Sequence, residues 1–187
     1  MSDESPETLR QAARDALATS VLANNRAAGR RVAAAESCTG GMVSVALTDI
    51  PGSSDVFSAG FITYSGNAKQ SQLDVSSEIL ETFGEVSLAT AWAMAAGALA
   101  NSDADVAVAI TGIAGPGGGS EKKPVGQVVF ARALRGQDPD DYFTQRVQFD
   151  SKDRGAIRHA ATLFALDLLQ PERDSLRPSE DIALPAP

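Results

Sequence analysis

The spacing of hydrophobic positions along the chain changes repeatedly between a helical and an extended pattern. Leu9, Ala13, Leu17 and Val21 recur at helical spacing, which predicts an amphipathic helix from Ser5 to about Ala23. Short apolar or β-prone runs bounded by turn residues are, by contrast, typical of strands. Such runs predict strands at residues 31–35, 57–64, 105–110, 125–134 and about 142–149.

The remaining segments predict helices. Helical patterns occupy residues 42–49, a short stretch from Ser76 or Ser77 to Gly84, residues 87–101 and residues 152–169. Only a polar turn joins the last two strands, so we expect them to pair as an antiparallel hairpin. The order of elements predicts an α/β protein, a three-layer α/β/α sandwich with a mixed β-sheet. We expect one domain over residues 1–170 and a poorly ordered C-terminal tail over residues 171–187.

Composition narrows the classes of protein that fit this pattern. A chain of 187 residues with 43% hydrophobic residues suits one globular domain with an ordinary core. Its formal net charge of −8 argues against nucleic acid or an anionic membrane as the main partner. One Cys and one His leave no intramolecular disulfide and no usual zinc site, so no metal is expected. The acidic start, MSDESPET, and the lack of a long apolar run predict a cytoplasmic protein without a signal peptide.

The segment from Glu36 to Gly41 is the first candidate for chemistry. It follows the first predicted strand and precedes a helix, which predicts a tight turn at a strand end. Backbone amides and the positive end of a helix dipole at such a turn suit an anion or an oxyanion. The turn also carries two possible nucleophiles, Ser37 and Cys38. The alternative is that its Ser and Thr only cap the helix, as these residue types commonly do.

The second candidate is the glycine-rich segment 111–120, which follows the strand predicted at 105–110. It is not a Walker A sequence, because Gly118 stands where that motif requires Lys, and it fails the G-x-G-x-x-G pattern. Because glycine has no side chain beyond hydrogen, the backbone of such a loop can still approach a ligand closely. The alternative is a flexible loop that binds nothing. Because ligands gather at the carboxyl ends of strands in open α/β sheets, we expect this loop and the turn at Ser37 to lie together.

A serine hydroxyl needs a neighbouring base to become a nucleophile. The chain is predicted to leave the strand at 57–64 through a turn from Tyr64 to Lys69. Lys69 can be that base if burial or a nearby cation lowers its pKa, and Tyr64, at the start of the turn, can relay a proton or hold the substrate. Spacing alone favours a simpler interpretation, in which Lys69 is solvated and Tyr64 packs at a strand end. The motif G-x-S-x-G is absent around Ser37, and His159 is interpreted as an ordinary helix residue rather than as a partner of Ser37 or Cys38.

Four segments, taken in order, resemble one protein family. They are AESCTGG (residues 35–41), TYS…AK (63–69), VS…A…MA (86–95) and TGIAGPGGGSEKKPVG (111–126). Together they resemble the CinA C-terminal domain over about residues 7–169. This family of competence/damage-inducible proteins includes nicotinamide mononucleotide (NMN) amidohydrolases, or NMN deamidases. No segment resembles the molybdopterin-binding-like N-terminal domain of longer CinA proteins, so the resemblance implies the stand-alone form.

The resemblance implies hydrolysis of the carboxamide of NMN to nicotinic acid mononucleotide and ammonia, in pyridine nucleotide salvage, without a cofactor or a metal. By position, it implies that Ser37 is the nucleophile and Lys69 its base, with Tyr64 assisting. Arg154 and Arg158 match arginines that the family has near its last helix. Substrate contacts are implied for Thr39, Gly40, Gly41, Thr111, Gly112, Gly117, Gly118 and Arg154. A homodimer is expected from the resemblance alone.

The chain departs from the family pattern at two places. Gly66 stands where the family commonly has Asn after Tyr-Ser, and the segment ahead of Arg154 is wider, which bears on how a phosphate would be bound. Two other interpretations share the same fold: a nucleotide-binding module without turnover, and an amidase that acts on a different amide. The presence of Ser37, Tyr64 and Lys69 favours an enzyme, because a binding module needs no nucleophile with a base.

Overall fold

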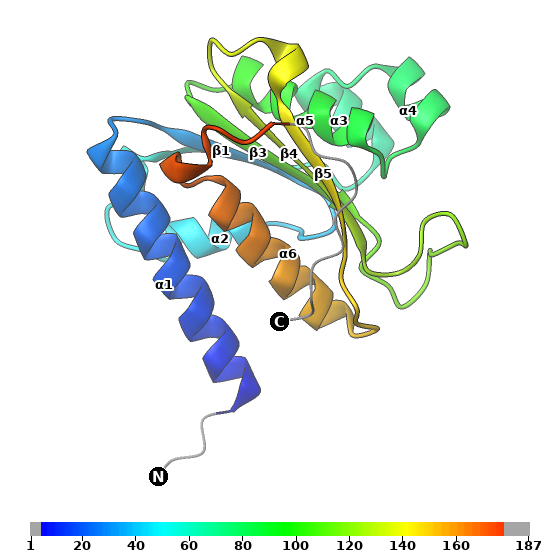
Figure 1. Ribbon diagram of the computed structural model, residues 1–187, viewed down its shortest axis with the longest axis horizontal. Coiled ribbons are helices and arrows are strands. Elements are labelled where there is room, and N and C mark those ends of the chain that lie inside the picture. Colours follow the sequence, from blue (N-terminus) through cyan, green and yellow to red (C-terminus); the bar gives the residue numbers. More distant parts are fainter. Residues whose placement is uncertain (1–4, 178–187) are drawn as a thin grey trace.

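The computed structural model describes residues 5–177, and a mixed sheet of five strands lies at its centre (Figure 1). The strands are β1 (Val32–Glu36), β2 (Phe57–Ile62), β3 (Val106–Gly112), β4 (Gln127–Leu134) and β5 (Phe143–Gln148). Their order across the sheet is β2-β1-β3-β4-β5. β1 runs parallel to β2 and β3, whereas β4 pairs antiparallel with β3 and β5. The predicted hairpin of the last two strands is confirmed.

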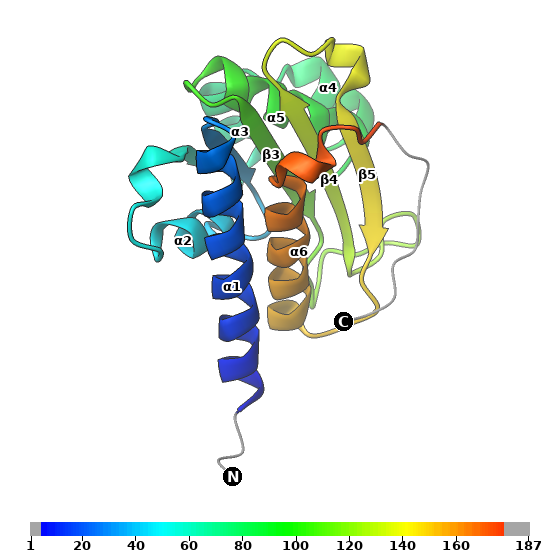
Figure 2. The same cartoon turned by 60° about the vertical axis from the view of Figure 1, so that its left-hand side comes forward.

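Helices cover both faces of this sheet. One layer holds α1 (Pro6–Ala27), α2 (Met42–Thr48) and α6 (Arg154–Leu168), and the other holds α3 (Gly66–Leu73), α4 (Ser77–Phe83) and α5 (Leu88–Ala100) (Figure 1). The predicted three-layer α/β/α sandwich is therefore confirmed. Figure 2 shows α1 beside α6, with its first turns extending beyond the start of α6. No helix within residues 5–177 is long and apolar enough to cross a membrane.

The two faces of the central strands carry side chains of different size. Positions that face the α1–α2–α6 layer are mostly larger, as at Val106, Val108 and Ile110 of β3. The alternate positions of β1 and β3 face α5, and they are alanines. Because alanine is small, α5 lies close to the sheet and packs on it with its own alanines. Gly97 extends this close packing to α3, since a Cβ there would lie 2.0 Å from the carbonyl oxygen of Leu73.

The sequence analysis missed α3. It predicted a turn from Tyr64 to Lys69, because Gly66 and Asn67 are typical turn residues. In the structure the Ser65 hydroxyl caps a helix by accepting from the amide of Ala68 at 3.2 Å. Only Lys69 and Leu73 of α3 are buried, so no helical pattern of apolar residues marks it. The other predicted elements are present, with ends displaced by a few residues.

Residues 171–177, the first part of the segment expected to be a tail, contact the domain. A 3₁₀ turn at Pro171–Arg173 follows α6, and Asp174 forms ion pairs with Arg30, at 2.7 Å, and with Arg132. Leu176 packs against the hydrophobic core. The domain therefore extends beyond the expected boundary at residue 170. The rest of the expected tail, residues 178–187, lies outside the described residues.

Candidate active site

The carboxyl ends of β1, β2 and β3 share one edge of the sheet, because these neighbouring strands run parallel. Three loops leave from this edge: the turn 37–41 after β1, the segment 63–65 after β2 and the glycine-rich segment after β3. Two arginines in the first turns of α6, Arg154 and Arg158, donate hydrogen bonds to all three of these loops. The expectation that these loops lie together is confirmed.

Ser37 and Lys69 are in hydrogen-bond contact. Ser37 follows β1 directly, and its Oγ lies 3.2 Å from Nζ of Lys69, which projects from α3. The same Nζ donates to the Thr63 carbonyl oxygen at 2.9 Å and lies 3.4 Å from Oε2 of Glu85. The Lys69 side chain is fully buried, so it is not the solvated lysine that spacing alone favoured. Burial lowers the pKa of Lys69, while the carboxylate of Glu85 opposes that shift.

Glu36 occupies the amino end of α2. Its buried carboxylate accepts from the amides of Gly41, Val43 and Ser44 at 2.9, 3.2 and 2.9 Å, and from the Ser44 hydroxyl at 2.8 Å. A carboxylate is favoured at this end of a helix, because the unpaired amides carry partial positive charge. The amides of Gly41, Val43 and Ser44 therefore already bind an anion that the protein supplies. The expectation that the turn suits an anion or an oxyanion stays a prediction for its other amides.

Gly40 and Gly41 shape the turn that carries Ser37. Their φ angles are +59° and +95°, in the left-handed region that residues with a Cβ rarely adopt. The Gly40 amide donates to the Ser37 carbonyl oxygen at 3.0 Å, and the Gly41 amide is bound to Glu36. Neither amide is therefore available to the substrate contacts expected of these glycines. Thr39 is fully buried, and its hydroxyl has no hydrogen-bond partner among the described residues.

Arg154 joins two of the predicted site loops. As the first residue of α6, it donates to the Gly115 carbonyl oxygen at 2.6 Å and to the Tyr64 hydroxyl at 2.9 Å. Tyr64 is 59% exposed, and its hydroxyl binds Arg154 rather than the amine of Lys69. The structure therefore places Tyr64 at the mouth of the site with Arg154. Within the described residues, the Tyr64 hydroxyl forms no hydrogen bond with Ser37 or Lys69.

Arg158 holds the turn after β1 from the side of α6. Its Nε donates to the Cys38 carbonyl oxygen at 3.1 Å, and its second guanidinium nitrogen donates to that of Thr39 at 2.7 Å. The amino end of α6 itself is capped by Asp153, whose Oδ1 accepts from the Ala156 amide at 2.7 Å. The arginine side chain thus holds the turn that carries Ser37, while Asp153 takes one amide at this end of the helix.

Four predicted site residues lie at the end of β3 or in the loop after it. Two of them pack within the protein and two are exposed. The Thr111 hydroxyl donates to the Glu85 carbonyl oxygen at 2.8 Å. A Cβ on Gly112 would lie 2.8 Å from Cα of Val128, so this glycine is required by the contact between β3 and β4. Gly117 and Gly118 are exposed, and nothing lies within 4 Å of where a Cβ on Gly117 would be. The exposed pair leaves room for a ligand to approach the loop backbone.

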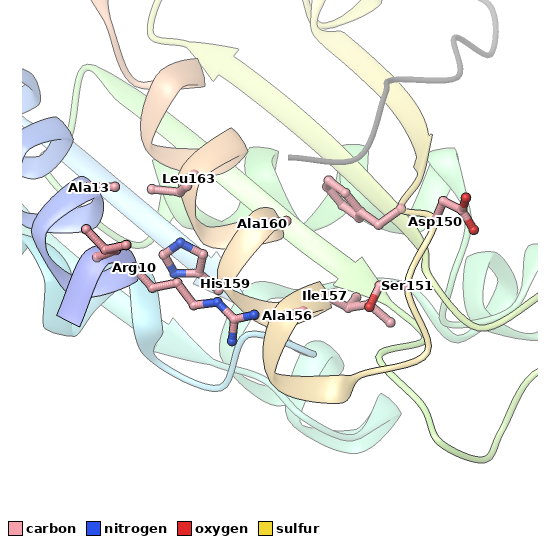
Figure 3. A pocket seen from close by; sticks show the side chains of 11 residues that line it. Arg10, Ala13, Asp150, Ser151, Ala156, Ile157, His159, Ala160 and Leu163 are labelled. Carbon is pink, nitrogen blue, oxygen red and sulfur yellow. The ribbon is translucent and has the colours of Figure 1, made fainter. Parts of the chain in front are cut away.

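The side chains of Cys38 and His159 form no hydrogen bond with Ser37 or Lys69 within the described residues. Cys38 belongs to the hydrophobic core, and burial raises the pKa of its thiol to about 12. His159 lines a separate cavity of about 430 Å³ between α1 and α6, where its ring points toward Arg10 (Figure 3). Burial lowers the pKa of His159, and the positive charges of Arg10 and Arg14 lower it further. Across residues 5–177, no three His, Cys, Asp or Glu side chains gather where they could hold a metal ion.

Two residues of the site were not found from the sequence. Glu36 is a charged residue at the end of an apolar strand, and that break in the pattern is a signal that could have identified it. Glu85 lies in the connection between α4 and α5, between Gly84 and Val86. Nothing in its local pattern marks it, because its contact with Lys69 depends on how α3 and α5 pack.

The fold and the site define an α/β/α sandwich protein with a buried serine–lysine pair at the carboxyl edge of its parallel strands. Residues 14–172 match the model of the CinA C-terminal domain, and the chain belongs to this family.

Similar proteins include both short and long relatives. The chain is 50% identical over 145 residues to the nicotinamide-nucleotide amidohydrolase PncC of Escherichia coli, which covers 77% of this chain and 85% of that protein. It is 58% identical to a CinA-like protein of Mycobacterium avium over 143 residues. This aligned stretch is 76% of this chain but 33% of that protein. The chain thus spans about a third of the length of several curated relatives it matches. Among solved structures, the competence/damage inducible protein CihA from Agrobacterium tumefaciens superposes with a TM-score of 0.80 at 44% identity, covering 84% of this chain and 93% of that one.

Proposed function

We propose that this protein hydrolyses the carboxamide of NMN to nicotinic acid mononucleotide and ammonia, with Ser37 as nucleophile and Lys69 as base. The 50% identity to the Escherichia coli amidohydrolase, over 85% of that protein, supports the reaction. The observation that carries the proposed chemistry is the 3.2 Å contact between Nζ of Lys69 and Oγ of Ser37. A module that only binds a nucleotide has no use for a buried amine against a hydroxyl.

In the first step of the proposed reaction, neutral Lys69 accepts the hydroxyl proton of Ser37 while Oγ attacks the carboxamide carbon. The tetrahedral intermediate collapses, the C–N bond breaks, and Lys69 gives its proton to the departing ammonia. Water then attacks the ester on Ser37, again with Lys69 as base, which releases the carboxylic acid and restores the hydroxyl. Burial supports this role, because it lowers the pKa of Lys69 and so raises the neutral fraction of the amine.

The tetrahedral intermediate needs hydrogen-bond donors for its negative oxygen. The amides of Ser37, Gly40 and Gly41 already donate to oxygens of the protein. Those of Cys38 and Thr39 donate to no oxygen within the described residues. We assign the oxyanion contacts to these two amides, which directly follow the nucleophile in the chain.

The phosphate of NMN also needs a binding group, and we assign it to Arg154 beside the exposed glycine-rich loop. A guanidinium offers several N–H donors in a plane and suits a phosphate. Arg154→Ala is therefore expected to raise KM for NMN about tenfold or more, since hydrogen bonds to charged groups contribute about 1.5–3 kcal/mol. Nicotinamide riboside, which lacks the phosphate, serves as the control substrate. An equal loss with both substrates would contradict the assignment.

The proposed reaction is tested by incubating the purified protein with NMN and measuring ammonia and nicotinic acid mononucleotide, which should form in equal amounts. Lys69→Met keeps the bulk of the buried side chain and removes the base, so kcat should fall by about 10²–10⁴. Lys152→Met, at an exposed lysine, is the matched control and should retain activity. No turnover by a folded wild-type sample would overturn the NMN assignment. The expected homodimer stays a prediction, which the molar mass in solution tests.

A further inference from the structure

Glu85 lies beside the buried amine of Lys69, and no sequence motif pointed to it. Its Oε2 is 3.4 Å from Nζ of Lys69. The Lys69 side chain is 0% exposed, whereas that of Glu85 is 51% exposed. The carboxylate therefore connects the buried amine to solvent.

Lys69 has three acceptors for its three N–H groups when it is an ammonium. They are Oγ of Ser37, the carbonyl oxygen of Thr63 and the carboxylate of Glu85. This set suits the charged form of the amine, because an ammonium donates three hydrogen bonds and a neutral amine donates two.

Few other charges act on this amine. Cys38, in the turn after β1, lies near enough to interact with it electrostatically, but a thiol with a pKa of about 12 is neutral at physiological pH. The helix packed against α3 is α5, and its residues Leu88–Ala100 include no ionisable side chain. Thr63 presents a carbonyl oxygen from the end of β2. Glu85 is thus the anion in direct contact with Lys69 within the described residues.

Two features hold Glu85 at this position. The Thr111 hydroxyl donates to the Glu85 carbonyl oxygen at 2.8 Å, which fixes the backbone against the end of β3. Gly66, at the start of α3, leaves room for the carboxylate, since a Cβ there would lie 3.1 Å from Oε1 of Glu85.

We infer that Glu85 is a positioning residue that holds Lys69 as an ammonium in the resting protein and so sets the pH above which Lys69 acts as a base. The inference rests on the proposed function, in which neutral Lys69 takes the proton of Ser37. To reach that state, an N–H bond of Lys69 breaks and the proton passes to water at the exposed carboxylate. An opposite charge within about 4–6 Å favours the charged form of an amine by one to three pKa units.

The inference is tested on Glu85→Gln, with Glu81→Gln, at an exposed glutamate of α4, as matched control. The pKa of Lys69 is measured in the absence of substrate, from the ¹³Cε resonances of the lysines, with the Lys69→Met spectrum as assignment. In Glu85→Gln it should fall by about 1 unit or more, and in Glu85→Asp, which withdraws the carboxylate, by less. The acid limb of kcat/KM for NMN should move to lower pH by the same amount. Glu81→Gln should change neither.

An unchanged Lys69 pKa in Glu85→Gln would overturn the inference, as would an acid limb that does not follow the shifted pKa. The NMR titration needs no turnover, so it separates this inference from the proposed function. If the Lys69 pKa falls in Glu85→Gln but the wild type does not hydrolyse NMN, the charge coupling stands and the reaction is wrong. If the wild type hydrolyses NMN and the pKa does not move, the reaction stands and the role of Glu85 is wrong.

Discussion

The carboxylate of Glu36 is predicted to be the main support of the turn that carries Ser37. It is fully buried and accepts four hydrogen bonds, three from backbone amides of Gly41, Val43 and Ser44 and one from the Ser44 hydroxyl. Glu36→Gln keeps one acceptor oxygen and turns the other into a donor that faces N–H or O–H groups. Two bonds to a charged acceptor are lost, each contributing about 1.5–3 kcal/mol. The Ser44 hydroxyl can turn to accept from the new amide, which recovers part of this loss, so we expect the free energy of unfolding to fall by about 3 kcal/mol.

Urea unfolding followed by circular dichroism measures this change. With a denaturant dependence of about 2 kcal/mol per molar urea, the midpoint should fall by about 1.5 M, and Tm by about 6–12 °C. Glu81→Gln, which changes the same chemical group at an exposed site, should stay within about 0.5 kcal/mol of the wild type. The reasoning is refuted if Glu36→Gln is as stable as this control.

Three further predictions concern other parts of the molecule. Because burial raises the pKa of Cys38 to about 12, its thiol should react with a disulfide reagent only on unfolding. Cys38→Ala should still hydrolyse NMN, and a folded but inactive Cys38→Ala would contradict the view that this thiol takes no part in the reaction. Gly97→Ala places a Cβ 2.0 Å from the carbonyl oxygen of Leu73 and should cost about 1–3 kcal/mol in urea unfolding, whereas Gly117→Ala, with nothing within 4 Å, should be neutral. Burial alone would raise the pKa of Asp174, but the hydrogen bond from Arg30 and the charge of Arg132 hold it below its ordinary value. The stability that this carboxylate contributes is therefore present above the unfolded-state pKa of about 4 and lost as pH falls through the lower folded pKa. Asp174→Asn should thus make the free energy of unfolding depend less on pH in the acid range. An unaltered pH dependence would contradict this prediction.

The layers of the fold could be predicted from the sequence because the strands are short apolar or β-prone runs between turn residues. β3 shows this best, since its buried run ends directly at Thr111 and Gly112, where the glycine-rich loop begins. Parallel pairing of β1 with β2 and β3 then brings the candidate loops to one edge. The pairing of Ser37 with Lys69 was implied by the family resemblance, because spacing alone favoured a solvated lysine.

The residues that the pattern could not reveal act through contacts between distant segments. α3 buries only two side chains, so its apolar pattern is too weak to compete with the turn residues Gly66 and Asn67. The contact of Glu85 with Lys69 joins the connection between α4 and α5 to a residue inside α3 and leaves no periodic signal. The same holds for Asp174, whose partners Arg30 and Arg132 lie far away in the chain. Side-chain pairing of this kind follows from the packing of layers rather than from local sequence.

The rate of ammonia release from NMN by Ser37→Ala, compared with the wild type and with Ser71→Ala, tests the central claim most directly. Ser71 is an exposed serine of α3, so its substitution controls for the loss of a hydroxyl near Lys69. If Ser37 is the nucleophile, Ser37→Ala should lose about 10³-fold or more in kcat while Ser71→Ala matches the wild type. Ammonia release by Ser37→Ala at the wild-type rate would contradict the account.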